Sequence, residues 1–92
     1  MDGDDRRLDG NAVGGLLGEI FPFEMTSVWT ICSGCRAMGQ VGAQAAYLDG
    51  PGAVVRCAHC DTVLIRVAKG GGRYWLDLRG AICVQIDDVP RG

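Results

Sequence analysis

The stretch that decides the fold is a pair of Cys-x-x-Cys motifs, Cys32-Ser33-Gly34-Cys35 and Cys57-Ala58-His59-Cys60, with 21 residues between them. Two cysteines three positions apart in a tight turn can direct both sulfur atoms to one point. Two such turns supply four thiolates at the corners of a tetrahedron, the geometry of a structural Zn²⁺ site with Zn–S bonds of about 2.3 Å. The separation is close to the roughly 15–20 residues typical of such sites. We therefore predict that Cys32, Cys35, Cys57 and Cys60 bind one structural Zn²⁺ ion.

Disulfides and redox chemistry are the alternative uses of these cysteines. A Cys-x-x-Cys pair can form a thioredoxin-like redox site, but neither pair here precedes a clear helical pattern, which that site requires. Two disulfides would suit a secreted chain. The first residues, Met1-Asp2-Gly3-Asp4-Asp5, are acidic and contain no apolar run, unlike a signal peptide. We therefore expect reduced cysteines and a cytoplasmic protein.

Residues near the motifs lead to further expectations. Gly34 provides an unhindered backbone in the first turn, whereas Asp61 rather than glycine follows the second motif, so we expect a less regular second turn. His59 is expected at the rim of the site, where it can hydrogen-bond to the sulfur atoms without binding the metal. Cys83 lies in an alternating segment, residues 81–86, and is expected to be a small buried hydrophobic residue.

Length and composition predict one small domain that needs support beyond its apolar core. The chain has 92 residues, of which 48% are hydrophobic, enough for a core but marginal for stability at this length. A structural metal often supplies the missing stability, because binding it is then part of folding. No stretch approaches the roughly 20 apolar residues of a membrane-spanning helix, so we expect no membrane association. The net charge of −2 provides no large basic excess for nucleic acid.

The order of the hydrophobic patterns predicts a small mainly-β domain, a zinc ribbon of antiparallel hairpins preceded by a short helix. We divide the chain into a disordered acidic tail (1–8), a helix (9–22), a zinc-ribbon-like β domain (23–87) and a polar tail (88–92). The helix has an apolar stripe, a capping residue in Asp9 or Asn11, and a stop at Pro22. The predicted strands are residues 27–31, 41–48, 53–56, 62–68, 73–78 and 81–86, and each cysteine motif is the tip of a hairpin.

Several stretches resemble a known family. They are Leu8-Asp9-Gly10-Asn11-Ala12, residues 16–21, the two cysteine motifs and Arg73-Tyr74-Trp75-Leu76-Asp77-Leu78-Arg79-Gly80. In these the chain resembles DUF6510, a bacterial family of small zinc-ribbon-like proteins found in actinobacteria, over residues 8–86. The resemblance implies a zinc ribbon and a bound metal but no activity. It also implies genes that neighbour those of flavin- or molybdenum-dependent oxidoreductases, and hence an oxidoreductase as a candidate partner.

The residue types favour binding over catalysis. Four thiolates would saturate Zn²⁺ and leave no open position for a reactive water molecule. The chain has one histidine, and Gly70-Gly71-Gly72 lacks the lysine and serine of a phosphate-binding loop. We therefore predict a non-catalytic accessory module, not an enzyme, that binds another protein and has no identified small-molecule substrate. Trp29 and Trp75 are candidate anchors, since aromatic residues dominate interface hot spots.

Two alternative functions stay open. Arg66, Lys69, Arg73, Trp75 and Arg79 combine bases with an aromatic ring around one hairpin, a composition suited to nucleic acid. Binding that weakens steeply with salt would indicate that function. Four cysteines can also hold iron, as in rubredoxin-like electron carriers, and the protein would then be coloured. Zn²⁺ and a protein partner are the main predictions.

Overall fold

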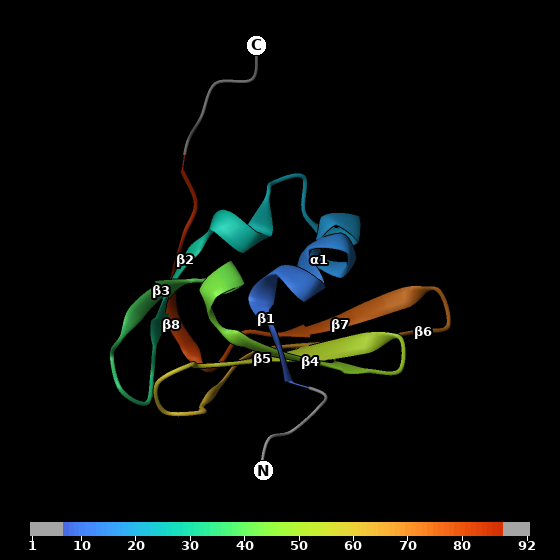
Figure 1. Cartoon of the computed structure of the whole chain (residues 1–92). Coiled ribbons are helices and arrows are strands. Elements are labelled where there is room, and N and C mark those ends of the chain that lie inside the picture. The colour runs from blue at the N-terminus through green and yellow to red at the C-terminus, as the bar shows by residue number, and fades with distance from the viewer. Residues whose placement is uncertain (1–6, 88–92) are drawn as a thin grey trace.

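Two antiparallel sheets make up most of the computed structural model, which describes residues 7–87 (Figure 1). The five-stranded sheet has the order β1-β4-β5-β6-β7, and the three-stranded sheet has the order β3-β2-β8. The strands are β1 (Arg7–Asp9), β2 (Trp29–Cys32), β3 (Met38–Gln40), β4 (Ala45–Asp49), β5 (Gly52–Arg56), β6 (Val63–Gly70), β7 (Arg73–Asp77) and β8 (Ala81–Gln85). The short helices are η1 (Gly10–Val13), α1 (Gly14–Ile20), η2 (Met25–Ser27) and η3 (Val41–Ala43). The fold is the expected mostly-β zinc ribbon with one short α-helix.

The N-terminal region departs in detail from the predicted helix over residues 9–22. Asp9 ends strand β1 and caps η1, where its side chain accepts a hydrogen bond from the backbone N–H of Asn11 at 3.1 Å. Gly10 lies so close to η3 that a Cβ atom there would stand 1.7 Å from the carbonyl oxygen of Val41. The segment therefore begins as a strand and a 3₁₀ turn, and α1 is confined to Gly14–Ile20. The predicted tails at 1–6 and 88–92 lie outside the described residues, whereas residues 7 and 8 belong to β1.

The helical segments cover one face of the five-stranded sheet and enclose the core (Figure 1). Leu17 of α1 and Val13 of η1 are 1% exposed, and they belong to one cluster with Val55, Leu64 and Ile65 of the sheet. Burial of this apolar set is the main force that holds the glycine-rich helix, because its own propensity is poor. None of the helices within residues 7–87 is long and apolar enough to cross a membrane.

Strand β6 contains a bulge that the period-two pattern did not predict. The pairing of β5 with β6 shifts between Val55 and Arg56, which leaves Leu64 as an extra residue between Val63 and Ile65. As a result Leu64 and Ile65, adjacent in sequence, are both 1% exposed. Bulges bend a strand and re-aim its side chains. Here the bulge lies four residues after Cys60 and turns two successive side chains into the core.

The β6–β7 hairpin confirms a turn within the predicted loop Lys69-Gly70-Gly71-Gly72, but Lys69 and Gly70 belong to β6 and only Gly71 and Gly72 form the loop. Gly71 and Gly72 have φ values of 59° and 77°, and they join strands in which Gly70 pairs with Arg73. Two positive-φ residues in a two-residue loop suit the twist of a hairpin. The register places Tyr74 and Leu76 on the helix-covered side and Arg73, Trp75 and Asp77 on the opposite side, the outer face.

The three-stranded sheet contradicts the prediction for Cys83. Cys83 pairs with Ile31 of β2, and both point to the side of the sheet opposite the buried Thr30 and Cys32. No segment within residues 7–87 covers that side, so Cys83 is exposed. In β8 it is Val84 that packs against the core, whereas Ile82 is 52% exposed. The pairing of β2 with β8 shifts between Ile31 and Cys32, which leaves Ile82 as an extra residue, so the predicted alternation is interrupted at Ile82.

Candidate metal centre

The two cysteine motifs form two knuckles with the same backbone hydrogen bonds. In the first knuckle (residues 32–36) the N–H of Arg36 donates to the carbonyl of Cys32 at 2.9 Å, and in the second (residues 57–61) the N–H of Asp61 donates to Cys57 at 2.9 Å. In both, the N–H of the first cysteine donates to the carbonyl five residues later, at 3.0 Å in the first knuckle and 2.8 Å in the second. The first knuckle joins β2 to β3 and the second joins β5 to β6. Each is the tip of a hairpin, as predicted.

The residue after each second cysteine adopts a left-handed conformation. Arg36 has a φ of 66° and Asp61 a φ of 70°, so the second turn is as regular as the first, and the expectation of a less regular one was wrong. Asp61 is held there by Arg56, whose Nη1 donates to its carbonyl oxygen at 3.0 Å. Asparagine and aspartate tolerate this region better than most residues. Gly34 has a steric role instead, since a Cβ there would lie 2.3 Å from the Oγ1 of Thr62.

The two knuckles bring the four sulfur atoms together. The Sγ atoms of Cys32, Cys35, Cys57 and Cys60 all lie within 4.8 Å of one another. The shortest separations are between knuckles, 3.5 Å from Cys32 to Cys60 and 3.7 Å from Cys35 to Cys57. A tetrahedron with Zn–S bonds of about 2.3 Å has edges of about 3.8 Å, so the set fits a four-coordinate metal ion. The four cysteines can hold one metal ion, and their chemistry suits the soft-ligand metals zinc and iron.

The site is sheltered on one side only. Cys32 and Cys57 are 1% and 4% exposed, whereas Cys35 and Cys60 are exposed to solvent. Burial raises the pKa of Cys32, but hydrogen bonds from the backbone N–H groups of Cys35 and Gly34 hold it at about 6. The backbone N–H of Ala37 lowers the pKa of Cys35, yet burial and the neighbouring thiols raise it to about 11. Metal binding to thiolates releases protons, so a cation at this site would displace the proton of Cys35.

Hydrogen bonds to the sulfur atoms come mainly from the backbone. The N–H of Gly34 points to the Sγ of Cys32 at 3.3 Å, and the N–H of His59 points to the Sγ of Cys57 at 3.4 Å. His59 thus contacts the sulfur atoms as expected, but through its backbone, while its side chain is exposed. The hydroxyl of Thr62 lies 3.0 Å from the Sγ of Cys60 and can donate to its thiolate. Such donors stabilise thiolate charge and orient the ligands.

Gln44 supports the site and was missed by sequence analysis. It is 7% exposed, and its Oε1 accepts a hydrogen bond at 2.9 Å from the N–H of Ala58, within the second knuckle. Its Nε2 donates to the carbonyl of Gln40 in β3 at 3.1 Å. The side chain therefore ties the second knuckle to the strand that leaves the first. No local signal marks Gln44, because its partners are 4 and 14 residues away in sequence.

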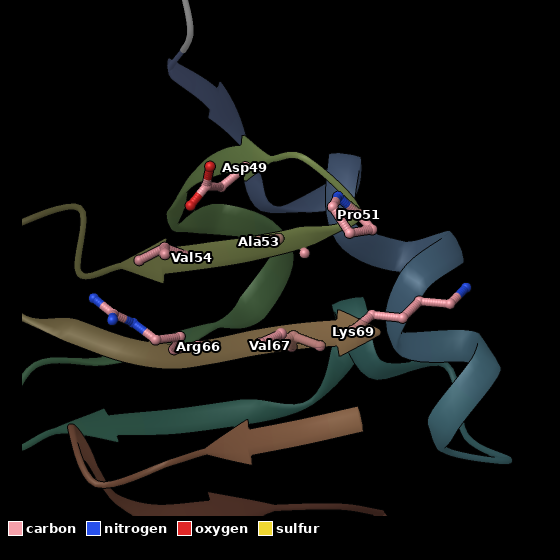
Figure 2. Close-up of a pocket in the computed structure, with 9 residues that line it drawn as sticks. Asp49, Pro51, Ala53, Val54, Arg66, Val67 and Lys69 are labelled. Atoms are coloured by element: carbon pink, nitrogen blue, oxygen red, sulfur yellow. The ribbon is translucent and has the colours of Figure 1, made fainter. Parts of the chain in front are cut away.

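The predicted binding residues do not form one cluster. Trp29 lies half-buried in the three-stranded sheet, across from Gln40 and Gln85, and is not part of the hairpin. Lys69 reaches toward α1 (Figure 2), where its Nζ lies 2.7 Å from Glu19 Oε1. The hydroxyl of Tyr74 also donates to Glu19, at 2.5 Å.

Of the other predicted residues, Arg66, Arg73 and Trp75 lie on the outer face of the hairpin, and Arg79 follows β7. Arg66 is next to Val54 on the neighbouring strand and borders a hollow of about 290 Å³ (Figure 2). A second hollow of about 510 Å³ adjoins it, lined by Arg66, Ala68, Trp75, Leu76, Asp77, Leu78 and Arg79. Arg79 forms an ion pair with Asp77 at 2.7 Å, and its guanidinium lowers the pKa of that carboxyl to about 2. Arg73 shares this face but does not line either hollow.

Comparison with known protein families finds a family that matches the chain. The family model of DUF6510 matches residues 4–89, nearly the whole chain, and its description is a family of unknown function. The chain belongs to DUF6510. The knuckles and the hairpin both lie within the DUF6510 match. No curated protein and no solved structure matches the chain.

Proposed function

We propose that this member of DUF6510 is a non-catalytic module that binds another protein, with a fold stabilised by one Zn²⁺ ion on Cys32, Cys35, Cys57 and Cys60. The four thiolates complete a tetrahedral shell, and a complete shell leaves no position for a substrate or a reactive water molecule. The metal has a structural role in this proposal, because it joins two hairpins of a chain too small to rely on its apolar core.

The observation that carries the binding role is the exposed Trp75 beside the 510 Å³ hollow. Trp75 is 55% exposed, the highest value among the large apolar residues of the described chain. A tryptophan at the edge of a hollow, flanked by arginine and aspartate, has the composition of an interface hot spot. Two of the predicted cationic residues are neutralised within the protein, Lys69 by Glu19 and Arg79 by Asp77. This supports a protein partner over nucleic acid, which needs free positive charge.

Affinity capture tests the proposed role. Tagged, zinc-loaded protein is incubated with lysate of the source cells beside two variants, Trp75→Ala and Trp29→Ala, after equal melting temperatures have been verified. The proposal predicts a specific protein that is retained by the parent chain and by Trp29→Ala, is lost with Trp75→Ala, and resists nuclease. Equal retention by Trp75→Ala would contradict it. Capture of nucleic acid that is released by moderate salt would support the alternative function instead.

A further inference from the structure

Within residues 7–87, strand β7 is an edge of the five-stranded sheet and has an apolar centre. It pairs with β6 on one side and is the last strand of the five-stranded sheet. Tyr74, Trp75 and Leu76 follow one another in its middle and are 37%, 55% and 37% exposed. Its pairing with β6 contains no bulge, and the strand contains no proline or lysine. An edge without these devices pairs readily with another strand, and Arg73 and Asp77 place a charge at each end of β7 that an incoming strand must match.

The hydrogen-bonding direction of β7 follows from the hairpin register. A two-residue loop makes its flanking residues, Gly70 and Arg73, a hydrogen-bonded pair. In an antiparallel ladder hydrogen-bonded pairs alternate with non-hydrogen-bonded pairs, so Trp75 and Asp77 also bond to β6. The N–H and C=O groups of Tyr74 and Leu76 therefore point away from β6, to the free edge. A partner strand would bond to these two residues.

Charge along β7 favours a second copy of the same strand. An antiparallel pairing around a two-fold axis at Trp75 places Tyr74 opposite the partner's Leu76, where both residues present outward backbone groups. It also places Arg73 opposite the partner's Asp77, a pair of opposite charges that occurs twice by symmetry and adds to the contact of Asp77 with Arg79 of its own chain. Shifting the register by two residues in one direction places Arg73 opposite Arg79 of the other copy, and shifting it in the other direction places Arg73 opposite Trp75. Only the central register matches backbone direction, apolar side chains and charge together.

We propose that two copies of this chain associate edge to edge through β7, forming a continuous ten-stranded sheet. In the dimer the two Trp75 side chains meet on the outer face as a non-hydrogen-bonded cross-strand pair, in which side chains approach closely. The proposal rests on the proposed function, since it names the partner that the Trp75 surface binds. The knuckles lie at the opposite end of the molecule from the hairpin loop, so pairing leaves the metal centre free (Figure 1).

A charge exchange between two variants tests this register. Arg73→Glu and Asp77→Lys each place like charges at both cross-strand pairs of a homodimer, and each should weaken self-association about tenfold. Mixed together, the two variants restore both pairs, because Glu faces Lys and Asp faces Arg. Native mass spectrometry of the zinc-loaded full chain, with one variant labelled with ¹⁵N, should show the mixed dimer in clear excess over both homodimers. Asp49→Lys, the same charge change at a position outside β7, should leave the dimer intact.

A proline variant tests the backbone contact separately. Leu76→Pro removes an outward N–H while sparing the ladder with β6, so the chain should fold, keep its metal and be monomeric. Three results would overturn the proposal: a parent chain that is monomeric at high concentration, a dimer unaffected by Leu76→Pro, or no excess of the mixed dimer. A monomeric parent chain that still captures another protein through Trp75 would leave the proposed function standing and remove only the second copy as its partner.

Discussion

The two ends of β6 differ in burial: the end next to the second knuckle is buried, and the end next to the hairpin loop is exposed. The first end of β6 follows the second knuckle, and Leu64 and Ile65 are buried there. Just before it, the hydroxyl of Thr62 lies 3.0 Å from the Sγ of Cys60, and the carbonyl of Thr62 accepts a hydrogen bond from the N–H of Cys57 at 2.8 Å. At its last end β6 enters the glycine loop, and the last three residues are all exposed (Figure 1). Buried side chains are concentrated at the knuckle end of β6, the metal end, and exposed apolar surface at the hairpin end. In the proposed function, a metal at the knuckle end stabilises the fold and leaves the hairpin end open for binding.

The largest effect is expected from removing a metal ligand. Cys57→Ser or Cys32→Ser leaves three thiolates and takes away binding free energy on the order of 10 kcal/mol, comparable to the whole stability of a small domain. Both variants should lose the metal and the cooperative thermal transition, measured by metal analysis and circular dichroism. Cys83→Ser serves as the matched control and should keep both. Full metal content in either ligand variant would break the comparison, because the metal end would then not depend on these four cysteines.

The next effect tests how closely the two sheets meet beside the metal. A Cβ at Gly80 would lie 1.6 Å from the carbonyl oxygen of Val63, and Gly80 itself accepts a hydrogen bond from Ser33 in the first knuckle at 2.8 Å. Gly80→Ala should therefore reduce the free energy of unfolding by roughly 3 kcal/mol, since backbone must shift to relieve the overlap. Gly70→Ala, at the hairpin end, meets nothing within 4 Å and should have a much smaller effect. If chemical denaturation showed equal losses of unfolding free energy for the two variants, the metal end would not be more closely packed than the hairpin end.

Gln44 provides a finer test of the metal end. Gln44→Ala leaves the N–H of Ala58 and the carbonyl of Gln40 without their side-chain partner, which should cost about 1–3 kcal/mol of unfolding free energy. The second knuckle should also loosen, so a chelator should remove the metal faster from this variant. The exposed Gln85, changed to Ala, is the control and should change neither value. An unchanged rate of metal loss in Gln44→Ala would show that the knuckle does not need this support.

The smallest effect is expected at the hairpin end, where exposed Glu19 binds Lys69 and Tyr74. The hydrogen bond from Lys69 and then that from Tyr74 lower the pKa of Glu19, so its contribution is complete above the ordinary value of 4.5 and is lost as pH falls through the lowered pKa. Glu19→Gln should therefore lower the melting temperature slightly and by a constant amount around neutral pH. High salt should shrink the difference. A large decrease that salt does not affect would mean that this contact is part of the core.

Sequence analysis predicted the two knuckles well because their determinants are local. Four cysteines at fixed spacing identify the ligands, and Gly71 with Gly72 identifies the hairpin loop. Strand β3 and the bulge at Leu64 were missed, because both depend on pairing with distant strands. Val41 was placed in a strand, yet it begins η3, which packs against Gly10. Cys83 was predicted to be buried because free cysteine commonly behaves as a small hydrophobic residue, but it is exposed in β8, where a bulge at Ile82 interrupts the alternation.

The most direct test of the metal end is native mass spectrometry of the full chain purified without added metal. The account predicts one Zn²⁺ per chain, with the protons of the four ligand thiols displaced and the thiol of Cys83 still reactive toward an alkylating agent. One iron in a coloured sample would change the metal and move electron transfer ahead of binding. A metal-free chain that has lost four hydrogens would show two disulfides, and it would contradict the claim that a bound metal joins the two knuckles.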